Sequence, residues 1–303
     1  MTDIKVKAKS RGPNSRRGVL AAAYLSPTVI LLLVLMVTPI VMVVGYSFFN
    51  NVVTEQNPVL VGLANYVEIL GDSAFWNAAV NTSIFTLVSM VVHLILGLSF
   101  AMLLNTDLIG TRLRAAFRVV LILPWLFTIA IVAVLWRMLL DPHGLVNYLL
   151  TSVGFDVAQT DWLGEPSLAL GALTLINIWS GYPFYMVSLL AGLQGIPADL
   201  YEAARVDGAN AWQRFWNITI PQLRPLLISL ALLDVIWTTQ QFALIWMTTG
   251  GGPIDVTEVL STFTYKLAFS RNEFALASTS AVVILLASMV LAVLYARSQK
   301  ARD

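Results

Sequence analysis

Cysteine is absent from this chain of 303 residues, and histidine occurs only twice. Without cysteine there is no disulfide and no thiolate metal site, and the redox compartment cannot be read from the sequence. The zinc-protease motif H-E-x-x-H and the nucleophile elbow G-x-S-x-G are missing as well. Asp234 is the only acid well inside an apolar stretch, so a paired-carboxylate protease would lack its second acid. Intramembrane catalysis is therefore not expected, and His93 is expected to pack or hydrogen-bond between helices.

The sequence also lacks a phosphate-binding loop of the form G-x-x-x-x-G-K-[ST]. The run Gly250-Gly251-Gly252-Pro253 has no lysine after it, and it predicts the end of a helix followed by a sharp turn. The chain is therefore not expected to hydrolyse a nucleotide itself. No catalytic residue, cofactor site, metal site or nucleic-acid partner is predicted.

Charged residues are few, at 12% of the chain, whereas hydrophobic residues make up 58%. The mean hydropathy of +0.78 is that of a polytopic membrane protein. A helix needs about 20 apolar residues to cross the hydrocarbon core. Six stretches meet this requirement, at 19–48, 78–104, 117–140, 168–193, 223–248 and 274–296. The predicted fold class is an all-α integral membrane protein with six transmembrane helices.

Lys and Arg are distributed unevenly along the chain. Placing the N-terminus in the cytoplasm leaves only Arg137, Lys266 and Arg271 on the outer side, out of 18 basic residues. Because cytoplasmic loops carry the excess of Lys and Arg, both termini are predicted to be cytoplasmic. The external loops are then those at 49–77, 141–167 and 249–273.

This topology divides the chain into three parts. A basic cytoplasmic tail at 1–18 precedes the six-span domain at 19–297, and a cytoplasmic C-terminal tail follows at 298–303. The negative surface potential of the inner leaflet attracts a basic segment of this kind. Membrane lipid is therefore one predicted partner.

A charged stretch at 197–221 interrupts the apolar runs between the fourth and fifth spans, on the predicted cytoplasmic side. Pro197 can open a helix, and the acids Asp199 and Glu202 favour the positive end of its dipole. The small side chains of Ala203-Ala204 favour a helix and let another surface approach closely. The first half of the stretch therefore predicts a short helix outside the bilayer.

The second half of the stretch predicts a turn and another helix. Asp207-Gly208 can end the first helix, since glycine adopts left-handed dihedral angles at little cost. A second short helix is predicted at 210–219, with Pro221 ending it. These residues predict a helix-turn-helix on the cytoplasmic face without identifying what docks there.

The same stretch carries a family motif. Glu202-Ala203-Ala204, Gly208 and Ile218-Thr219-Ile220-Pro221 follow the spacing E-A-A-x3-G-x9-I-x-L-P, with Ile220 in place of leucine. The chain thereby resembles the membrane subunits of binding-protein-dependent ABC importers, over residues 24–296. Other stretches are similar to the carbohydrate-uptake branch, in particular its maltose and glycerol-phosphate "first" permeases: 61–66, Asn81-Thr82, 123–125, 191–197, 249–253 and Thr257-Glu258.

The resemblance implies a coupling role for this loop. In the family the loop is a coupling helix that inserts into a cleft of a cytoplasmic ATPase subunit. Glu202 would then make polar contacts with the ATPase, and Ala203 and Ala204 would permit close seating. Gly208 would form the turn, and the set of predicted coupling residues is completed by Asp207 and Pro221.

The resemblance also implies partners and a location. The expected partners are a second, different permease subunit, two cytoplasmic ATPase subunits that hold ATP and Mg, an extracytoplasmic solute-binding protein and a small-molecule solute. The expected location is the cytoplasmic (inner) membrane of a bacterium or archaeon, as a multi-pass protein. The chain itself would be a non-catalytic subunit.

A path for the solute is predicted from the fourth and fifth spans, where aromatic and polar side chains are mixed. The sequence Gly181-Tyr182-Pro183 is expected to unwind or kink the fourth span near mid-membrane. Helical spacing in the fifth span places four of the candidates on one face. The candidates are Asn177, Trp179, Tyr182, Asp234, Trp237, Thr238, Gln240 and Gln241.

Hydrogen bonding between helices is an equally weighted alternative for Asn177 and Thr238. The resemblance assigns no role to Asp234, because the acid common in the family follows the position of Phe242, where this chain has Ala243.

The resemblance thus implies a permease subunit of an ATP-driven importer for a sugar, polyol or glycerophosphodiester. The alternative is an ion-coupled secondary transporter of a small polar solute, which usually places several ionisable groups near the midplane. A structural or channel-forming bundle would not explain the charged loop.

Overall fold

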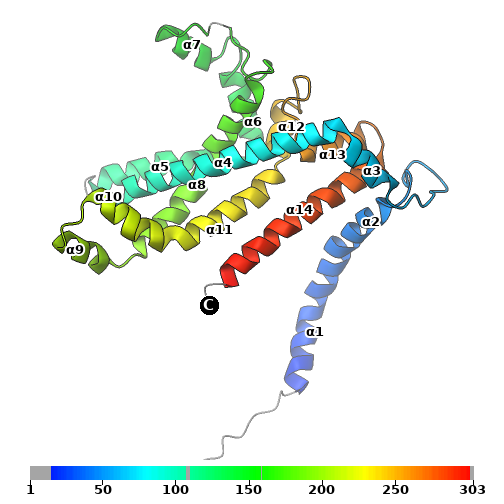
Figure 1. The fold of residues 1–303 in the computed structure, drawn as a ribbon, viewed down its shortest axis with the longest axis horizontal. Coiled ribbons are helices and arrows are strands. Elements are labelled where there is room, and N and C mark those ends of the chain that lie inside the picture. Colours follow the sequence, from blue (N-terminus) through cyan, green and yellow to red (C-terminus); the bar gives the residue numbers. More distant parts are fainter. Residues whose placement is uncertain (1–14, 107–109, 158, 301–303) are drawn as a thin grey trace, which may run out of the picture.

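The computed structural model describes residues 15–106, 110–157 and 159–300, and within them the regular structure is helical apart from one isolated bridge between Phe49 and Leu60 (Figure 1). The long helices are α4 (Ser73–Asn105), α8 (Ala169–Gln194), α11 (Ile220–Thr239) and α14 (Phe274–Lys300). The N-terminal helix consists of α1 (Ser15–Leu32), a π-helical turn (Leu33–Val37) and α2 (Thr38–Tyr46). Most of the predicted tails at 1–18 and 298–303 lies outside the described residues or in side chains that are not described.

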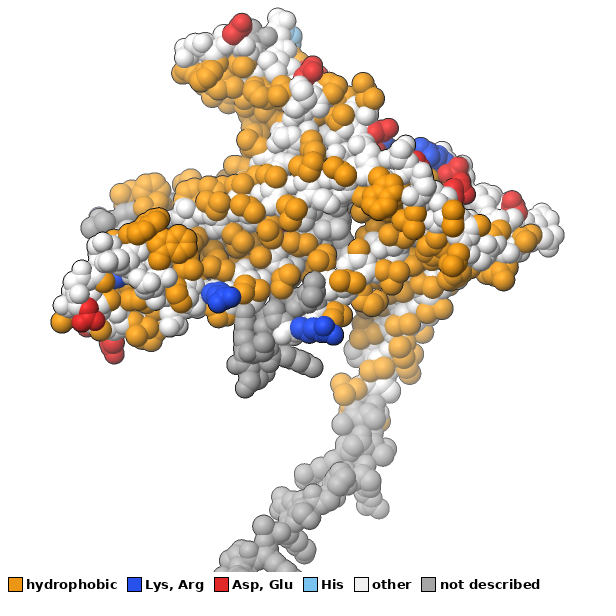
Figure 2. Space-filling view, viewed as in Figure 1, with side chains coloured by type: hydrophobic (Ala, Val, Ile, Leu, Met, Phe, Trp, Pro, Cys, Tyr) orange, Lys and Arg blue, Asp and Glu red, His pale blue; other side chains and the backbone are white. Residues whose placement is uncertain are grey.

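Shorter helices connect these long ones. They are α3 (Ala64–Gly71), α5 (Thr111–Leu126), α6 (Ile129–Leu139), α7 (Leu145–Ser152), α9 (Ala198–Val206), α10 (Ala211–Arg214), α12 (Ala243–Thr248) and α13 (Leu260–Phe269). In Figure 1, α9 and α10 lie at one end of the bundle, and α3, α12 and α13 lie at the other. Figure 2 shows hydrophobic side chains over the sides of the bundle and the charged ones mostly toward its ends.

Five helices of the described chain are long and apolar enough to cross a membrane, and a sixth span exists if the bent pair α5–α6 is one crossing. The prediction of 117–140 as one span needs correction, because α5 and α6 meet at an angle of 99°. Pro124 lies in the last turn of α5, and Phe127 and Thr128 are extended. Thr128 then caps α6 by accepting a hydrogen bond from the backbone N–H of Ile131, which starts a helix in a new direction.

The fifth predicted span, 223–248, is also interrupted. Helix α11 ends at Thr239, and α12 begins only at Ala243. The break is held from outside, since the Ser261 hydroxyl donates to the carbonyl of Gln241 at 2.7 Å and the ring of Phe242 packs on that of Tyr265. After α12, the predicted stop is confirmed: the helix ends at Thr248.

The fourth predicted span is one continuous helix, so the expected unwinding at Gly181-Tyr182-Pro183 is wrong. Helix α8 is packed against α4, and it is the most enclosed of the apolar helices in the described chain, with 56% of its apolar window buried. An ideal Cβ on Gly97 would stand 2.6 Å from the Cβ of Tyr185. The two backbones therefore approach closely at a glycine, as small residues allow between membrane helices.

Two stretches that are far apart in the sequence, Asn81-Thr82 and 258–260, meet at the end of the bundle that holds α12 and α13. The Asn81 side-chain amide donates to the carbonyl of Glu258 at 3.0 Å, and the Thr82 hydroxyl accepts from the backbone N–H of Leu260 at 2.9 Å. Lys266 forms an ion pair with the buried Glu258 and lies 3.3 Å from Asp255. These contacts fix α13 onto the start of α4.

Candidate functional site

The hairpin of α9 and α10 has a helix stop built from backbone hydrogen bonds. The N–H of Ala209 donates to the carbonyl of Ala204 at 2.8 Å, and the N–H of Gly208 donates to that of Arg205 at 3.1 Å. Gly208 has φ of 80°. This pair of bonds with a left-handed residue is the Schellman arrangement that ends helices at glycine. The predicted turn at Asp207-Gly208 is confirmed.

The second arm of the hairpin begins with a capping box between Asn210 and Gln213. It does not end at Pro221, which corrects the prediction. A π-helical turn at Phe215–Thr219 joins α10 to α11, and Pro221 lies in the first turn of α11. The π turn moves the hydrogen-bond register just before this proline, since the N–H of Ile220 donates to the carbonyl of Phe215 five positions earlier. Residues 211–239 form one apolar helix.

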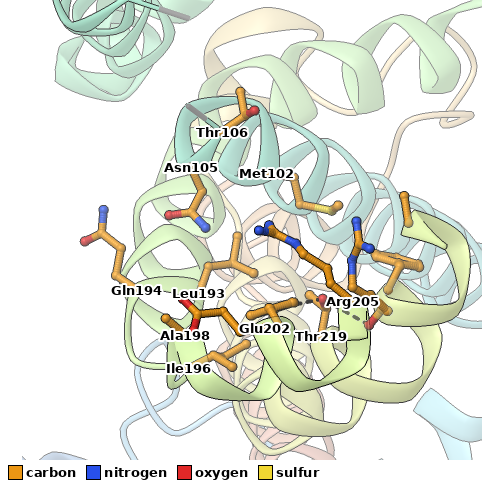
Figure 3. Close-up of a pocket in the computed structure, with 14 residues that line it drawn as sticks. Met102, Asn105, Thr106, Leu193, Gln194, Ile196, Ala198, Glu202, Arg205 and Thr219 are labelled. Atoms are coloured by element: carbon orange, nitrogen blue, oxygen red, sulfur yellow. Dashed lines mark hydrogen bonds between the residues drawn. The ribbon is translucent and has the colours of Figure 1, made fainter. Parts of the chain in front are cut away.

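The corner of the hairpin is braced by side chains. The hydroxyl groups of Tyr201 and Thr219 are 2.9 Å apart and link α9 to the π turn, and the Arg214 guanidinium donates to the carbonyl of Ala209 at 2.7 Å. A cavity of about 550 Å³ lies between this hairpin and the ends of α4 and α8. Figure 3 shows Asn105, Gln194 and Glu202 around it.

The predicted coupling residues are mostly exposed, and Glu202 also lines this cavity. Glu202, Ala203, Asp207 and Gly208 are exposed, Ala204 is half-buried, and Pro221 is exposed at the start of α11. Their neighbour Val206 is 88% exposed. The hairpin therefore exposes both apolar and charged side chains to its surroundings.

A second cavity, of about 320 Å³, lies in the middle of the bundle between α5, α6, α8 and α11. Five aromatic side chains contribute to its walls, and its polar groups come from α4, α8, α11 and the break that follows α11. Five of the predicted path residues line it: Asn177, Asp234, Trp237, Thr238 and Gln241. The residues that the sequence analysis did not select include His93, Trp125, Phe127, Phe184 and Tyr185.

Three predicted path residues do not line this cavity. Trp179 packs behind it, with its ring 5.5 Å from that of Trp136. Tyr182 is buried and its ring contacts that of Phe100 on the other side of α8. Gln240 is exposed at the end of α11. Helical periodicity cannot identify these positions, because it does not show which neighbouring helix each face meets.

A buried hydrogen-bond network forms the polar side of the central cavity. His93 Nδ1 lies 2.8 Å from Asp234 Oδ2, and its Nε2 lies 3.2 Å from the backbone carbonyl of Asn177. The Thr238 hydroxyl donates to Asp234 Oδ1 at 2.7 Å. The Asn177 amide donates to the Ser89 hydroxyl at 2.9 Å. Asn177 therefore makes the expected bond between helices, from α8 to α4, whereas Thr238 bonds Asp234 within α11; both residues also line the cavity.

His93 hydrogen-bonds between helices, as expected from the sequence, and its partner on α11 is Asp234. Asp234 is 141 positions away in the chain. The imidazole also stacks on the ring of Tyr185, with centroids 4.9 Å apart, and touches Gly181, where a Cβ would stand 2.4 Å from Nε2. Glycine at this position of α8 leaves the space that the imidazole occupies.

Apolar helices that can cross a membrane thus surround an aromatic cavity with a polar side, and an exposed hairpin extends from one end. These features define a multi-pass membrane transport subunit. The chain belongs to the family of binding-protein-dependent transport system inner membrane components, which it matches over residues 94–303. The family resemblance expected from the loop is confirmed, and the chain is a permease subunit of an ABC importer in the inner membrane.

Similar proteins extend over nearly the whole chain. The trehalose/maltose transport system permease protein MalF of Thermococcus litoralis is 33% identical over 281 residues, or 92% of this chain and 93% of that protein. The sulfoquinovosyl glycerol transport system permease protein SmoG of Agrobacterium fabrum is 32% identical over 287 residues, or 94% and 92%. A chain of a bacterial alginate ABC transporter, solved with an alginate-bound periplasmic protein, is 25% identical with a TM-score of 0.80, covering 92% of this chain and 93% of that one.

Proposed function

We propose that the hairpin of α9 and α10 is the docking element for a cytoplasmic ATPase subunit, and that α11 carries its movement to the solute cavity. The supporting observation is that a single helix joins the hairpin to the cavity. Residues 211–239 form one helix, whose first residues belong to the hairpin and whose last turns carry Asp234, Trp237 and Thr238. A displacement of the hairpin would move cavity-lining side chains as part of the same rigid helix.

The proposed orientation places the hairpin end in the cytoplasm, together with both termini. Most Lys and Arg residues lie on that side under this topology, in agreement with the positive-inside rule. The ATPase subunits, which would hold ATP and Mg, then meet the hairpin on the side where nucleotide is available. The opposite end, with α12 and α13, would face an extracytoplasmic solute-binding protein.

The proposed assembly contains a second, different permease subunit. The helix at 23–46 has none of its apolar window buried within this chain, so lipid or another subunit must cover it. The central cavity opens between α5, α6, α8 and α11. In the proposed heterodimer the second subunit closes this opening, and each chain provides half of the alternating-access path.

The proposed solute is a sugar or a related polyol derivative. The cavity combines the faces of Trp125 and Trp237 with the hydrogen-bonding groups of Asn177, Asp234 and Gln241. Flat aromatic faces suit the C–H surfaces of a sugar ring, and the polar groups suit its hydroxyls. Relatives named for trehalose, maltose and sulfoquinovosyl glycerol agree with this class. The ion-coupled alternative is not favoured, because the relatives are ABC permeases.

The docking role can be tested by Gly208→Glu. A Cβ at Gly208 meets no atom of this chain within 4 Å, so the new side chain would point into the space assigned to the ATPase. We expect loss of copurification with the ATPase and a fall in ATP-driven uptake of at least about tenfold, because bulk and charge enter the contact. Uptake is measured in proteoliposomes that contain the whole transporter and its binding protein.

Gly154→Glu is the matched control. Gly154 also has a positive φ, of 95°, is exposed, and has no atom within 4 Å of a Cβ. Both changes therefore have the same backbone cost, about 1–2 kcal/mol for a left-handed residue. Gly154 follows the end of α7 in the chain, and Figure 1 shows α7 apart from α9 and α10. Wild-type assembly and uptake by the Gly208→Glu variant would overturn the docking assignment.

A further inference from the structure

The hydrogen bonds of His93 determine how many protons it shares with Asp234. The partner of Nε2, 3.2 Å away, is the backbone carbonyl of Asn177, which can only accept. Nε2 must therefore carry a hydrogen. The Ser180 hydroxyl also donates to this carbonyl, at 3.1 Å, so the oxygen acts only as an acceptor.

A further proton lies between the two side chains. Nδ1 of His93 and Oδ2 of Asp234 are 2.8 Å apart, a distance that requires one hydrogen between them. If that hydrogen is on Nδ1, the pair is an imidazolium and a carboxylate. If it is on Oδ2, the pair is a neutral imidazole and a carboxylic acid. The net charge of the pair is zero in both cases.

The surroundings of the pair agree with a net charge of zero. His93 and Asp234 are each 2% exposed. The residues that line the central cavity include no Lys or Arg that could balance a lone carboxylate. The Thr238 hydroxyl also contacts the pair, donating to Oδ1 of Asp234. Tyr185 contacts both members, since its side chain is hydrogen-bonded to Asp234 and its ring stacks on the imidazole. A carboxylate without a proton or cation is costly at such a site.

We propose that His93 is a positioning residue that keeps Asp234 in a net-neutral pair, so that the central cavity accepts uncharged polyhydroxyl solutes and discriminates against cations. The proposal rests on the proposed function, since it narrows the solute class of the same cavity. Asp234 remains able to accept hydrogen bonds from solute hydroxyls, but it does not attract a cation. Without His93 the same carboxylate would have to take up either a cation or a proton from solution.

The proton count can be measured directly, because the chain has only two histidines. In the His143→Gln variant, ¹⁵N-histidine labelling leaves the imidazole of His93 as the only one. NMR of this full-length chain in detergent at neutral pH should show Nε2 bonded to hydrogen. An unprotonated Nε2 would overturn the proposal, since Asp234 would then be a carboxylate beside a neutral imidazole. This arm involves no transport, so its result is independent of the importer assignment.

The selectivity is tested with two sugars that differ in charge. Diacetylchitobiose is neutral, whereas chitobiose carries protonated amines at mildly acidic pH. Binding to the full-length chain is followed by tryptophan fluorescence, with Trp237→Phe to identify the cavity signal. His93→Gln cannot supply the shared proton, so we expect the ratio of the two affinities to shift by about tenfold toward the cation. His143→Gln should leave the ratio unchanged.

A second substitution separates charge from folding. In the double variant His93→Gln, Asp234→Asn the negative charge is removed, and the affinity ratio should return toward the wild-type value. A purely structural role of His93 would give no such rescue. An unchanged ratio in His93→Gln, or a wild-type chain that binds neither sugar, would overturn the assignment. ATP-driven uptake by the assembled transporter would still test the importer function separately.

Discussion

The close approach of α4 and α8 at Gly97 predicts a large effect of a single methyl group. In Gly97→Ala the new Cβ would stand 2.6 Å from the Cβ of Tyr185 and 3.0 Å from the backbone nitrogen of Met186. Carbon atoms in contact are about 3.5–4.0 Å apart, so the helices must separate by about 1 Å. The clashing atoms belong to the backbone of α8 or are fixed to it, and no side-chain rotation relieves the contact.

The size of the effect follows from two opposing terms. Overpacking of this kind costs about 1–3 kcal/mol, and the higher helix propensity of alanine offsets about 1 kcal/mol. The net loss of unfolding free energy is therefore up to about 2 kcal/mol. Because Tyr185 stacks on His93, the displacement also reaches the central cavity.

The matched variant is Gly171→Ala, in the first turns of α8. A Cβ there meets no atom of this chain within 4 Å, so only the propensity term remains and stability should be unchanged or higher by up to about 1 kcal/mol. Unfolding of both purified variants by SDS in mixed micelles, followed by tryptophan fluorescence, measures the difference. If Gly97→Ala proves as stable as Gly171→Ala, the close packing of α4 against α8 is refuted.

Two other contacts give predictions. Lys266→Met should lower stability by about 3 kcal/mol in the same unfolding assay, because Glu258 is 4% exposed and would lose its cation. Adding Glu258→Gln should recover much of the loss, and no recovery would contradict the pairing. Tyr201→Phe removes the hydrogen bond to Thr219 and should speed amide hydrogen exchange in α9 by a factor equivalent to about 1 kcal/mol. Tyr148→Phe, at an exposed position, is the control. An unaltered exchange rate in Tyr201→Phe would contradict a stabilising role of the Tyr201–Thr219 bond.

The membrane-spanning helices and the turn of the hairpin were predictable, because each depends on residues that are close together in the sequence. Apolar runs long enough to cross a bilayer identify the spans, because no other segment can satisfy its backbone in lipid. The turn at Gly208 was predictable for the same kind of reason, since the helix stop needs only a residue that tolerates positive φ and backbone bonds within a few positions. The spacing of the loop motif identified the family, which the match over 94–303 confirms.

Local signals were less informative where two effects compete on one segment. Pro124 permits either a kink or a break, and the chain breaks between α5 and α6 because Thr128 caps a helix in a new direction. Pro183 leaves α8 continuous, and Pro221 lies within the helix at 211–239 where a stop was predicted. The sequence of each segment does not contain the packing that selects among these outcomes.

By itself, the sequence determined that this is a multi-pass membrane subunit of an ABC importer, and it located a charged loop between two spans. Only the tertiary structure decided which polar residues meet. His93, Asn177 and Asp234 come from α4, α8 and α11, and their hydrogen bonds join positions as far apart as 141 residues. The physical reason is that periodicity gives the face of each helix, whereas the rotation and close approach of neighbouring helices depend on all their side chains at once.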